Sequence, residues 1–483
     1  MAQTGLFAIN VTTIFFDVAR GAAIAVCATL AARALIAIAT PRWVTATLVA
    51  WVVVPALAVA YVWAAFPFDG LHQPWCANVL HIILSAGRLA PIALVIVACV
   101  PPPPFDAMAY HCLRLTRAGH GFLFTLRFWS AGPGRCWLVA SALIFPLAFA
   151  EFEIGSRLNT GSWAVRLFDA QAGGQFLSTT LMQAAPGVMV QLAMLALAWW
   201  LMRGRGIIGA PHPQLTNPPW LRIVAWLTLA GGSVALVLFP LTTLVIQASN
   251  GFAVAFAQAG NLRAEIAASL LFAATTAGCA WLVAGLVDVR PSTSGIRRLF
   301  SAAVLIPGLC GSLVIGLVVL ACCQLPLLRP LANSPLPILA ALVALVLPYA
   351  LVLRWMSRVP NANAAWHQAT LLDAGAPNHR QAARNIRWSL VGQRRWWAVI
   401  LLFMWAYCDL AASAILHPVD MTPVLVRLYN FMHYGQSTAL SVQLTMTLLA
   451  PLVVITLAYL VLRLPPWHRL RVSSMKSESL RDV

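Results

Sequence analysis

The sequence predicts an all-α polytopic membrane protein with about eleven transmembrane helices arranged in two parallel halves. Three observations lead to this prediction. First, 61% of the 483 residues are hydrophobic and only 9% are charged, whereas a soluble domain carries roughly 25% charged residues. Second, apolar runs of about 20 residues, the length that a bilayer core requires, recur along the chain. Third, a pattern in the first half of the chain returns in the second half.

The apolar runs define the spans. Backbone polar groups within hydrocarbon must be paired inside their own segment, so each run is predicted to be a helix. We expect spans at approximately 19–38, 44–65, 78–100, 137–154, 177–202, 223–246, 265–289, 299–323, 336–353, 397–416 and 438–462.

The loops between these spans divide their basic residues unequally. The side that includes the C-terminal tail holds most of the arginines and Lys476, the only lysine. The other side holds only Arg157, Arg166, Arg263, Arg329 and Arg427. Because cytoplasmic loops are enriched in Lys and Arg, we predict a bacterial inner-membrane protein, surrounded by lipid, with a periplasmic N-terminus and a cytoplasmic C-terminus. This rule accounts for the net charge of +18 without nucleic-acid binding.

Two long predicted cytoplasmic loops, 101–136 and 354–396, contain the clearest part of the repeat. Residues 115–119 (Leu-Thr-Arg-Ala-Gly) align with 371–375 (Leu-Leu-Asp-Ala-Gly), and the Arg-Phe-Trp-Ser of 127–130 aligns with the Ile-Arg-Trp-Ser of 386–389. Further along, 165–168 align with 426–429 at a similar spacing of 256–261 residues. An even number of spans separates the partners. We therefore predict two parallel halves, 1–205 and 206–483, about an axis normal to the membrane.

The second loop and the segment after it resemble a known family. Residues 368–377 (Gln-Ala-Thr-Leu-Leu-Asp-Ala-Gly-Ala-Pro), with Arg380, Arg384 and Ile386 after them, resemble the EAA loop of binding-protein-dependent ABC transporter permeases. Residues 409–413, 426–430 and 433–435 resemble the following helix and outer loop in fused two-half permeases of the iron(III) and thiamine type. The resemblance is clearest over 360–462 and weaker over 110–202. The chain departs from the family pattern at Gln368, where the family has Glu, and at Gly375, which comes one position late.

The resemblance implies a fold like that of a type I ABC importer permease. Such a permease receives substrate, here iron(III) or another small cation or metabolite, from a periplasmic binding protein. A separate ATPase subunit, expected to be a homodimer, drives transport by docking on the EAA loops. By position, the second coupling helix would include Gln368, Ala369, Asp373, Gly375 and Pro377, and the first would include Ala118 and Gly119. The alternative for both segments is an ordinary solvated basic loop.

Catalytic motifs are missing from the sequence. It contains no G-x-x-x-x-G-K-[ST] phosphate loop, so the chain is not expected to hydrolyse ATP itself. No H-E-x-x-H or G-x-S-x-G pattern indicates an intramembrane enzyme, which makes that the weakest hypothesis. We expect no bound cofactor and no metal site, although His417 and His433 are outer-loop histidines.

Ionisable residues within predicted spans are costly and therefore count as candidates for function. Glu151, Glu153, Asp409 and Arg88 are candidate pathway residues that would contact a cationic or metal-bearing substrate. The alternative is that the acids cap helix ends or pair internally, for instance Glu151 with Arg88. The same residues support an alternative function, a secondary transporter driven by an ion gradient.

Two further pairs occupy matched positions in the two halves. Arg166 and Arg427 lie in matched outer loops, where they either steady those loops or contact a periplasmic binding protein. Pro91 and Pro348 lie in matched spans, and we expect both to kink their helices.

Overall fold

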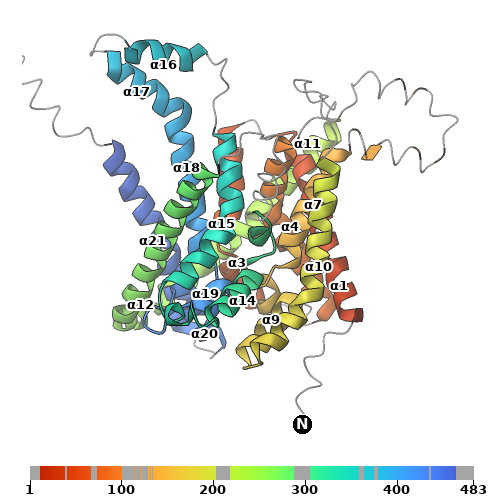
Figure 1. The fold of residues 1–483 in the computed structure, drawn as a ribbon, viewed down its shortest axis with the longest axis vertical. Coiled ribbons are helices and arrows are strands. Elements are labelled where there is room, and N and C mark those ends of the chain that lie inside the picture. Colours follow the sequence, from red (N-terminus) through yellow and green to blue (C-terminus); the bar gives the residue numbers. More distant parts are fainter. Residues whose placement is uncertain are drawn as a thin grey trace, which may run out of the picture.

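The computed structural model describes the chain apart from 1–10, 39–40, 67–72, most of 101–133, 203–217, 288–304, 358–363, 375–378, 434–436 and 464–483. For 11–12, 250–261, 433, 437–439 and 461–463 it describes only the backbone. All regular secondary structure in the described part is helical (Figure 1).

Seven helical segments are long and apolar enough to cross a membrane. They are α1 (Val11–Leu35), α4 (Pro74–Cys99), α10 (Leu177–Met202), Pro219–Ser249, Leu262–Leu286, α15 (Leu336–Met356) and α21 (Ser437–Arg463). The broken pair α2 (Arg42–Val53) and α3 (Ala56–Ala64), bent by 76°, forms an eighth span if it is counted as one. Pro55 lies at the bend, where it cannot supply the amide that a continuous helix needs. The chain is thus a polytopic helical protein with the apolar composition that is typical of membrane proteins.

The other three expected spans are shorter helices, so the count of eleven stays a prediction. They are α7 (Arg135–Phe149), α14 (Ser312–Cys323) and α18 (Gln393–Tyr407). Single helices were expected over 137–154 and 397–416, but both expectations are wrong, because the chain breaks after α7 and after α18. Short helices follow the breaks: α8 (Glu153–Arg157) and α19 (Ala411–Leu416).

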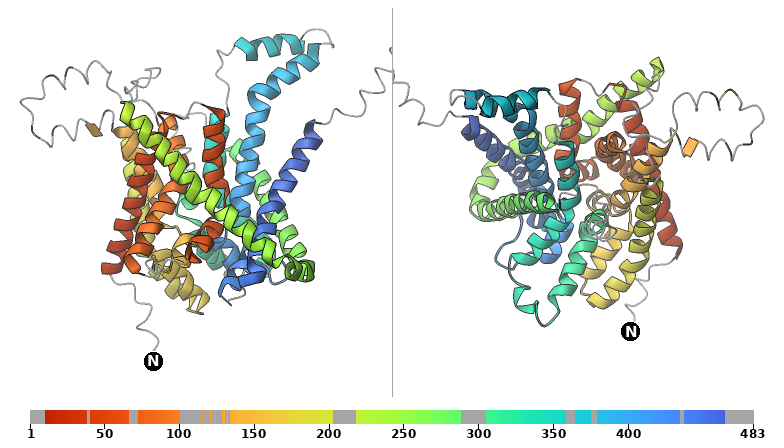
Figure 2. Two further views of the ribbon diagram at one scale, coloured as in Figure 1. Left: turned by 180° about the vertical axis from the view of Figure 1, so that it is seen from behind. Right: turned by 45° about the horizontal axis from the view of Figure 1, so that its top comes forward.

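The expected loop at 247–264 is also absent. Helix α11 (Pro219–Ser233) continues through the π-helical turn η3 (Val234–Leu238) into α12 (Phe239–Leu286). Residues 241–286 contain no proline and many alanines, and the helix continues through Asn250-Gly251 and Gly260-Asn261 although these pairs are typical of turns. In the left view of Figure 2 the helix runs diagonally across the bundle, from the first half towards the second.

The helices recur in the same order in the two halves. In the first half α7 and α8 are followed by α9 (Trp163–Ala172) and α10; in the second, α18 and α19 are followed by α20 (Val424–His433) and α21. The bend between α2 and α3 has a counterpart at Gly311, whose φ of 95° breaks the chain before α14. Pro91 and Pro348 both lie inside helices, in α4 and α15.

Both predicted cytoplasmic loops adjoin the same end of the bundle. Helix α1 runs away from the N-terminus, and Arg33 in its last turn lies over the Trp137 ring in the first turn of α7. At this end the second loop forms α16 (Ala364–Ala374) and α17 (Arg380–Arg387), which project beyond the bundle in Figure 1. A π-helical turn, η6 (Trp388–Gly392), joins α17 to α18. We call this the loop end and the opposite one the N-terminal end.

Helix α11 packs on the first half, although the predicted boundary at 205/206 assigns it to the second. Trp51 of α2 is fully buried against it, and the indole nitrogen of Trp51 donates to Ser233 Oγ at 3.3 Å. Trp63 of α3 donates to the carbonyl oxygen of Ala235 at 2.9 Å. No described element of the first half corresponds to α11, so this helix is an addition to the repeat.

Adjacent glycines in α11 provide a matched test of this packing. A Cβ at Gly232 would lie 2.3 Å from the Trp51 ring, whereas one at Gly231 would meet nothing within 4 Å. We expect Gly232→Ala to lower the free energy of unfolding by about 1–3 kcal/mol, because the buried Trp51 ring has no space to move into. Gly231→Ala should leave the free energy of unfolding unchanged or raise it slightly. Thermal unfolding of the purified variants measures this difference, and equal melting temperatures would contradict the packing.

Candidate functional site

A cavity of about 200 Å³ lies between the two halves. The first half lines it with residues from α2, α3, α4 and the α7–α8 break, and the second half with residues from α14, α15, α18 and the α18–α19 break. The four residues predicted to contact substrate, Arg88, Glu151, Glu153 and Asp409, all line this cavity. The structure therefore brings together residues that are up to 321 positions apart in the sequence.

Four interruptions of the helices meet at the cavity. They lie at Pro55, at Glu151, at Gly311 and at Asp409, two in each half. The first turn of a helix has backbone N–H groups without an intrahelical acceptor. Away from water these groups need another acceptor, because an unmade hydrogen bond there is costly. At three of the four breaks, side chains accept from the first turn of the helix that follows, which is α3, α8 or α19.

Glu151 caps helix α8. Its two carboxylate oxygens accept from the backbone N–H groups of Ile154 at 2.8 Å and Gly155 at 3.1 Å. His81 of α4, itself buried, places Nε2 3.0 Å from Glu151 Oε2 and Nδ1 3.0 Å from Thr160 Oγ1. The partner of Glu151 is therefore His81 rather than Arg88. Sequence reasoning missed His81, whose only signal was a histidine within an apolar run.

Asp409 caps helix α19, and it occupies the position in the second half that corresponds to Glu151 in the first half. Asp409 Oδ2 accepts from the backbone N–H of Ser413 at 3.1 Å and from its hydroxyl at 3.3 Å. The hydroxyl of Ser312, the first residue of α14, accepts from the backbone N–H of Ala412 at 3.1 Å. Each half thus has a carboxylate that caps the short helix after its break.

Glu153 and Arg88 hold the two ends of the broken span. Glu153 Oε2 accepts from the backbone N–H of Leu57 at 2.9 Å, in the first turn of α3. Arg88 Nη2 donates to the carbonyl oxygen of Val54 at 3.3 Å, at the end of α2. The carboxylate thus meets the positive end of one helix dipole and the guanidinium meets the negative end of the other.

These contacts favour helix capping as a role for the three acids, which is the alternative that the sequence left open. Each of the three carboxylates accepts from the N-terminal turn of a helix, so the cavity is not a cluster of free carboxylates. Within the described residues, no group of three or more His, Cys, Asp or Glu side chains is arranged to hold a metal ion. Whether substrate touches Arg88 or Glu153 stays a prediction.

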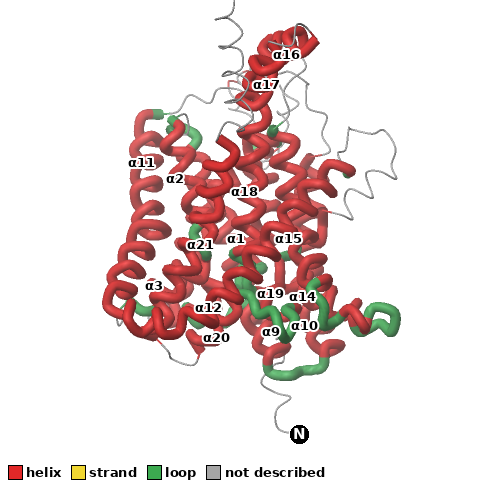
Figure 3. The backbone as a smooth tube through the Cα atoms, turned by 90° about the vertical axis from the view of Figure 1, so that its left-hand side faces the viewer, coloured by secondary structure: helices red, strands yellow, loops and turns green. Residues whose placement is uncertain are grey.

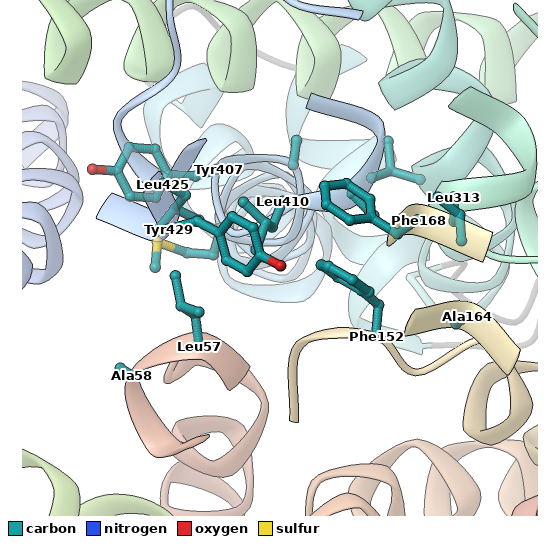
Figure 4. Close-up of a cluster of buried hydrophobic side chains, with 14 of the residues drawn as sticks. Leu57, Ala58, Phe152, Ala164, Phe168, Leu313, Tyr407, Leu410, Leu425 and Tyr429 are labelled. Carbon is teal, nitrogen blue, oxygen red and sulfur yellow. The ribbon is translucent and has the colours of Figure 1, made fainter. Parts of the chain in front are cut away.

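An aromatic cluster borders the cavity (Figure 4). Phe152, which lines the cavity, has its ring centroid 4.5 Å from Phe168 of α9 and 5.8 Å from Tyr429 of α20. The Tyr429 hydroxyl lies 3.1 Å from Ser156 Oγ, so the cluster joins the two halves. Helices α9 and α20 lie at the N-terminal end of the bundle in Figure 1. We call Phe152, Phe168 and Tyr429 the aromatic plug, because they lie between the cavity and that end.

Matched ion pairs link helices at the N-terminal end. Arg166 of α9 pairs with Asp17 of α1 at 2.5 Å, and Arg427 of α20 pairs with Glu265 of α12. Arg20 is a second partner of Asp17. The pairs connect α9 to α1 and α20 to α12. This arrangement supports the hypothesis that these arginines steady the outer segments. The sequence did not reveal their carboxylate partners, which lie more than 140 residues away.

The residues of the predicted coupling loops are only partly described. On α16, Gln368 is exposed and Ala369 is fully buried, together with Ala383 of α17. Asp373 forms an ion pair with Arg387 of α17 at 2.9 Å. Other predicted members lie outside the described residues: Gly375, Pro377, Ala118 and Gly119.

The chain matches no protein-family model, and no curated protein or solved structure matches it.

Substitutions at Asp409 test the capping role. Asp409→Asn keeps an amide oxygen that accepts from Ser413, whereas Asp409→Leu leaves the buried N–H and hydroxyl of Ser413 without this acceptor, at a cost of about 1–3 kcal/mol each. We expect the Leu variant to melt at a clearly lower temperature than the Asn variant. Asp420→Leu, in the exposed segment between α19 and α20, serves as the control and should have little effect. Equal destabilisation by Asn and Leu would rule out a capping role.

Cys408 allows the aromatic plug to be tested, because its thiol lines the cavity. In a chain whose other cysteines are replaced by alanine, Tyr429→Ala should speed the reaction of Cys408 with a membrane-impermeant thiol reagent severalfold. The reagent is added from the side of the N-terminus. Phe176→Ala, at an exposed position between α9 and α10, is the control and should leave the rate unchanged. An unchanged rate in Tyr429→Ala would show that the plug does not close the cavity.

Proposed function

We propose that this chain is the permease subunit of an ABC importer, with both halves fused in one polypeptide of eleven spans. It would lie in a bacterial inner membrane with its N-terminus in the periplasm. A periplasmic binding protein would deliver the substrate, iron(III) or another small cation or metabolite. A separate ATPase, contacting both halves as a homodimer, would supply the energy. The observation that supports this most is a helical arm outside the bundle that runs directly into the wall of the cavity.

The arm consists of α16, α17 and η6, and Figure 3 shows it projecting from the loop end. Burial of Ala369 and Ala383 and the ion pair between Asp373 and Arg387 hold α16 against α17. On α16 the side chain of Leu371 is 60% exposed. An exposed apolar side chain away from the bundle suits a partner subunit.

The arm is mechanically connected to the cavity. Helix α17 passes through η6 into α18 without a break. Helix α18 lines the cavity with Leu401, Met404 and Trp405 and ends just before Asp409. A displacement of α16 by a partner would therefore move one wall of the cavity as a rigid body, the kind of transition that closes or opens a binding site. The resemblance of residues 368–377 to an EAA loop agrees with this role.

A secondary transporter is the second candidate. The observation that favours it is the broken span α2–α3, whose two helix ends meet Arg88 and Glu153 at the cavity. Discontinuous helices near the middle of a bundle form the ion and substrate sites of several secondary transporters. The contact between His81 and Glu151 also provides a site at which a proton could be held.

Docking on α16 tests the first candidate. The chain is purified together with a P-loop ATPase encoded by a neighbouring gene. We expect Leu371→Asp to abolish co-purification, because a charge would be buried without a partner in the interface. Leu327→Asp, 87% exposed in the segment between α14 and α15, is the matched control and should retain the ATPase.

Transport in proteoliposomes separates the two candidates. Uptake that requires ATP and the ATPase, and is lost in Leu371→Asp, supports the importer. Uptake that continues without nucleotide and stops when the proton gradient is collapsed would reject it in favour of the secondary transporter.

A further inference from the structure

Helix α11 presents one face to the protein and the other to the outside of the bundle. Leu221, Ala225 and Leu229 are buried against the first half. The opposite face is apolar and open, with Ile223 62% and Leu227 68% exposed. In a chain of this composition the open face of a peripheral helix contacts lipid. Figure 3 shows α11 and α2 side by side at the edge of the bundle.

An aromatic pair joins α11 to α2 near the loop end. The rings of Trp43 and Trp226 stack with their centroids 5.5 Å apart and their planes 19° apart. Both rings remain exposed on the outside of the bundle. Tryptophan at such a position is characteristic of the interface between hydrocarbon and headgroups, because one part of the ring is apolar and its N–H is polar.

Two exposed arginines accompany the tryptophan pair. Arg42 directly precedes Trp43, and Arg222 lies four residues before Trp226, on the same face and about 6 Å nearer the start of α11. Both arginines precede the stacked tryptophans along their helices, and both helices begin at the loop end. Neither forms an ion pair with a carboxylate in the described part of the chain. The patch is thus positive and lies next to an apolar surface, and no described carboxylate pairs with it.

We propose that Arg42, Arg222, Trp43 and Trp226 form a binding site for an anionic phospholipid. The two arginines bind the headgroup phosphate, since a guanidinium donates two parallel hydrogen bonds to phosphate oxygens. The stacked indoles contact the glycerol region, and the acyl chains lie along Ile223 and Leu227. A soluble acidic protein would fit the arginines but not the exposed apolar face that continues from them, which is why we assign the site to lipid.

The site has a structural consequence for the rest of the molecule. A lipid held by both arginines bridges α2 and α11, the helix that the internal repeat does not include. Helix α2 leads directly to the break at Pro55, where the cavity begins. Bound lipid would therefore stabilise α2, a wall of the cavity, from the outside. The inference places the loop end at the cytoplasmic leaflet, where anionic lipids attract basic residues, and it does not depend on an ATPase.

Lipid titration of the full-length purified chain tests the site. Phosphatidylglycerol is added in detergent, and native mass spectrometry measures the fraction of protein with bound lipid. Phosphatidylcholine is the neutral lipid for comparison. We expect the double variant R42Q/R222Q to bind phosphatidylglycerol about 30-fold more weakly than the wild type. Binding of phosphatidylcholine should be the same in both proteins.

The matched control is R263Q/R329Q, which removes the same charge from exposed positions at the N-terminal end. It should bind phosphatidylglycerol as the wild type does. Melting temperatures in phosphatidylcholine show whether the variants are folded, and the single variant Arg222→Gln, at an exposed helix position, replaces the double variant if that one unfolds. Unchanged binding in the arginine variants, or an equal loss in the control, would overturn the proposal. Displacement of the lipid by millimolar inorganic phosphate would also overturn it, because the site would then take a free oxyanion.

Discussion

The structure depends on one constraint: backbone N–H and C=O groups must be paired wherever a helix stops inside an apolar bundle. Here four helix interruptions meet between the two halves. An unpaired amide in such a place costs about 1–3 kcal/mol, and at three of the four breaks a side-chain carboxylate pairs amides of the helix that follows. Glu151, Glu153 and Asp409 accept from the first turns of three helices, and Arg88 donates to the last carbonyl of α2. The polar character of the cavity is thus a consequence of the broken helices.

Because these charged side chains cap broken helices, a charge inside the bundle is not by itself evidence of a substrate site. The cost of a buried carboxylate is partly met by the helix end that it caps, so such a residue has a structural role whether or not it binds substrate. The two halves do this with different chemistry. Glu151 contacts a buried histidine, while Asp409 is surrounded by serine hydroxyls. The cavity is therefore lined by corresponding elements of both halves but differs in composition between them.

At the N-terminal end the two halves again have corresponding contacts, whereas the described elements at the loop end differ between the halves. At the N-terminal end, the pairs of Arg166 with Asp17 and of Arg427 with Glu265 tie the segments beyond the breaks to the long helices. The aromatic plug lies between these pairs and the cavity. At the loop end, the arm of α16 and α17 continues into α18, and α11 covers the first half. The breaks at Glu151 and Asp409 thus each lie between a helix that comes from the loop end, α7 or α18, and an outer segment held by an ion pair.

The sequence by itself determined the helical class, the positions of the long apolar helices and the recurrence of matched residues in two halves. These properties are local or periodic: hydrophobicity over about 20 residues fixes a span, and a repeat is visible in the printed chain. It also singled out Arg88, Glu151, Glu153 and Asp409, because charge in an apolar run is conspicuous. Only the tertiary structure decided that these four residues meet, that the predicted spans at 137–154 and 397–416 break, and that His81, Asp17 and Glu265 are partners. Those facts depend on contacts between segments that are distant in the sequence. A hydrogen bond such as that between Glu153 and Leu57 cannot be predicted from hydropathy or periodicity.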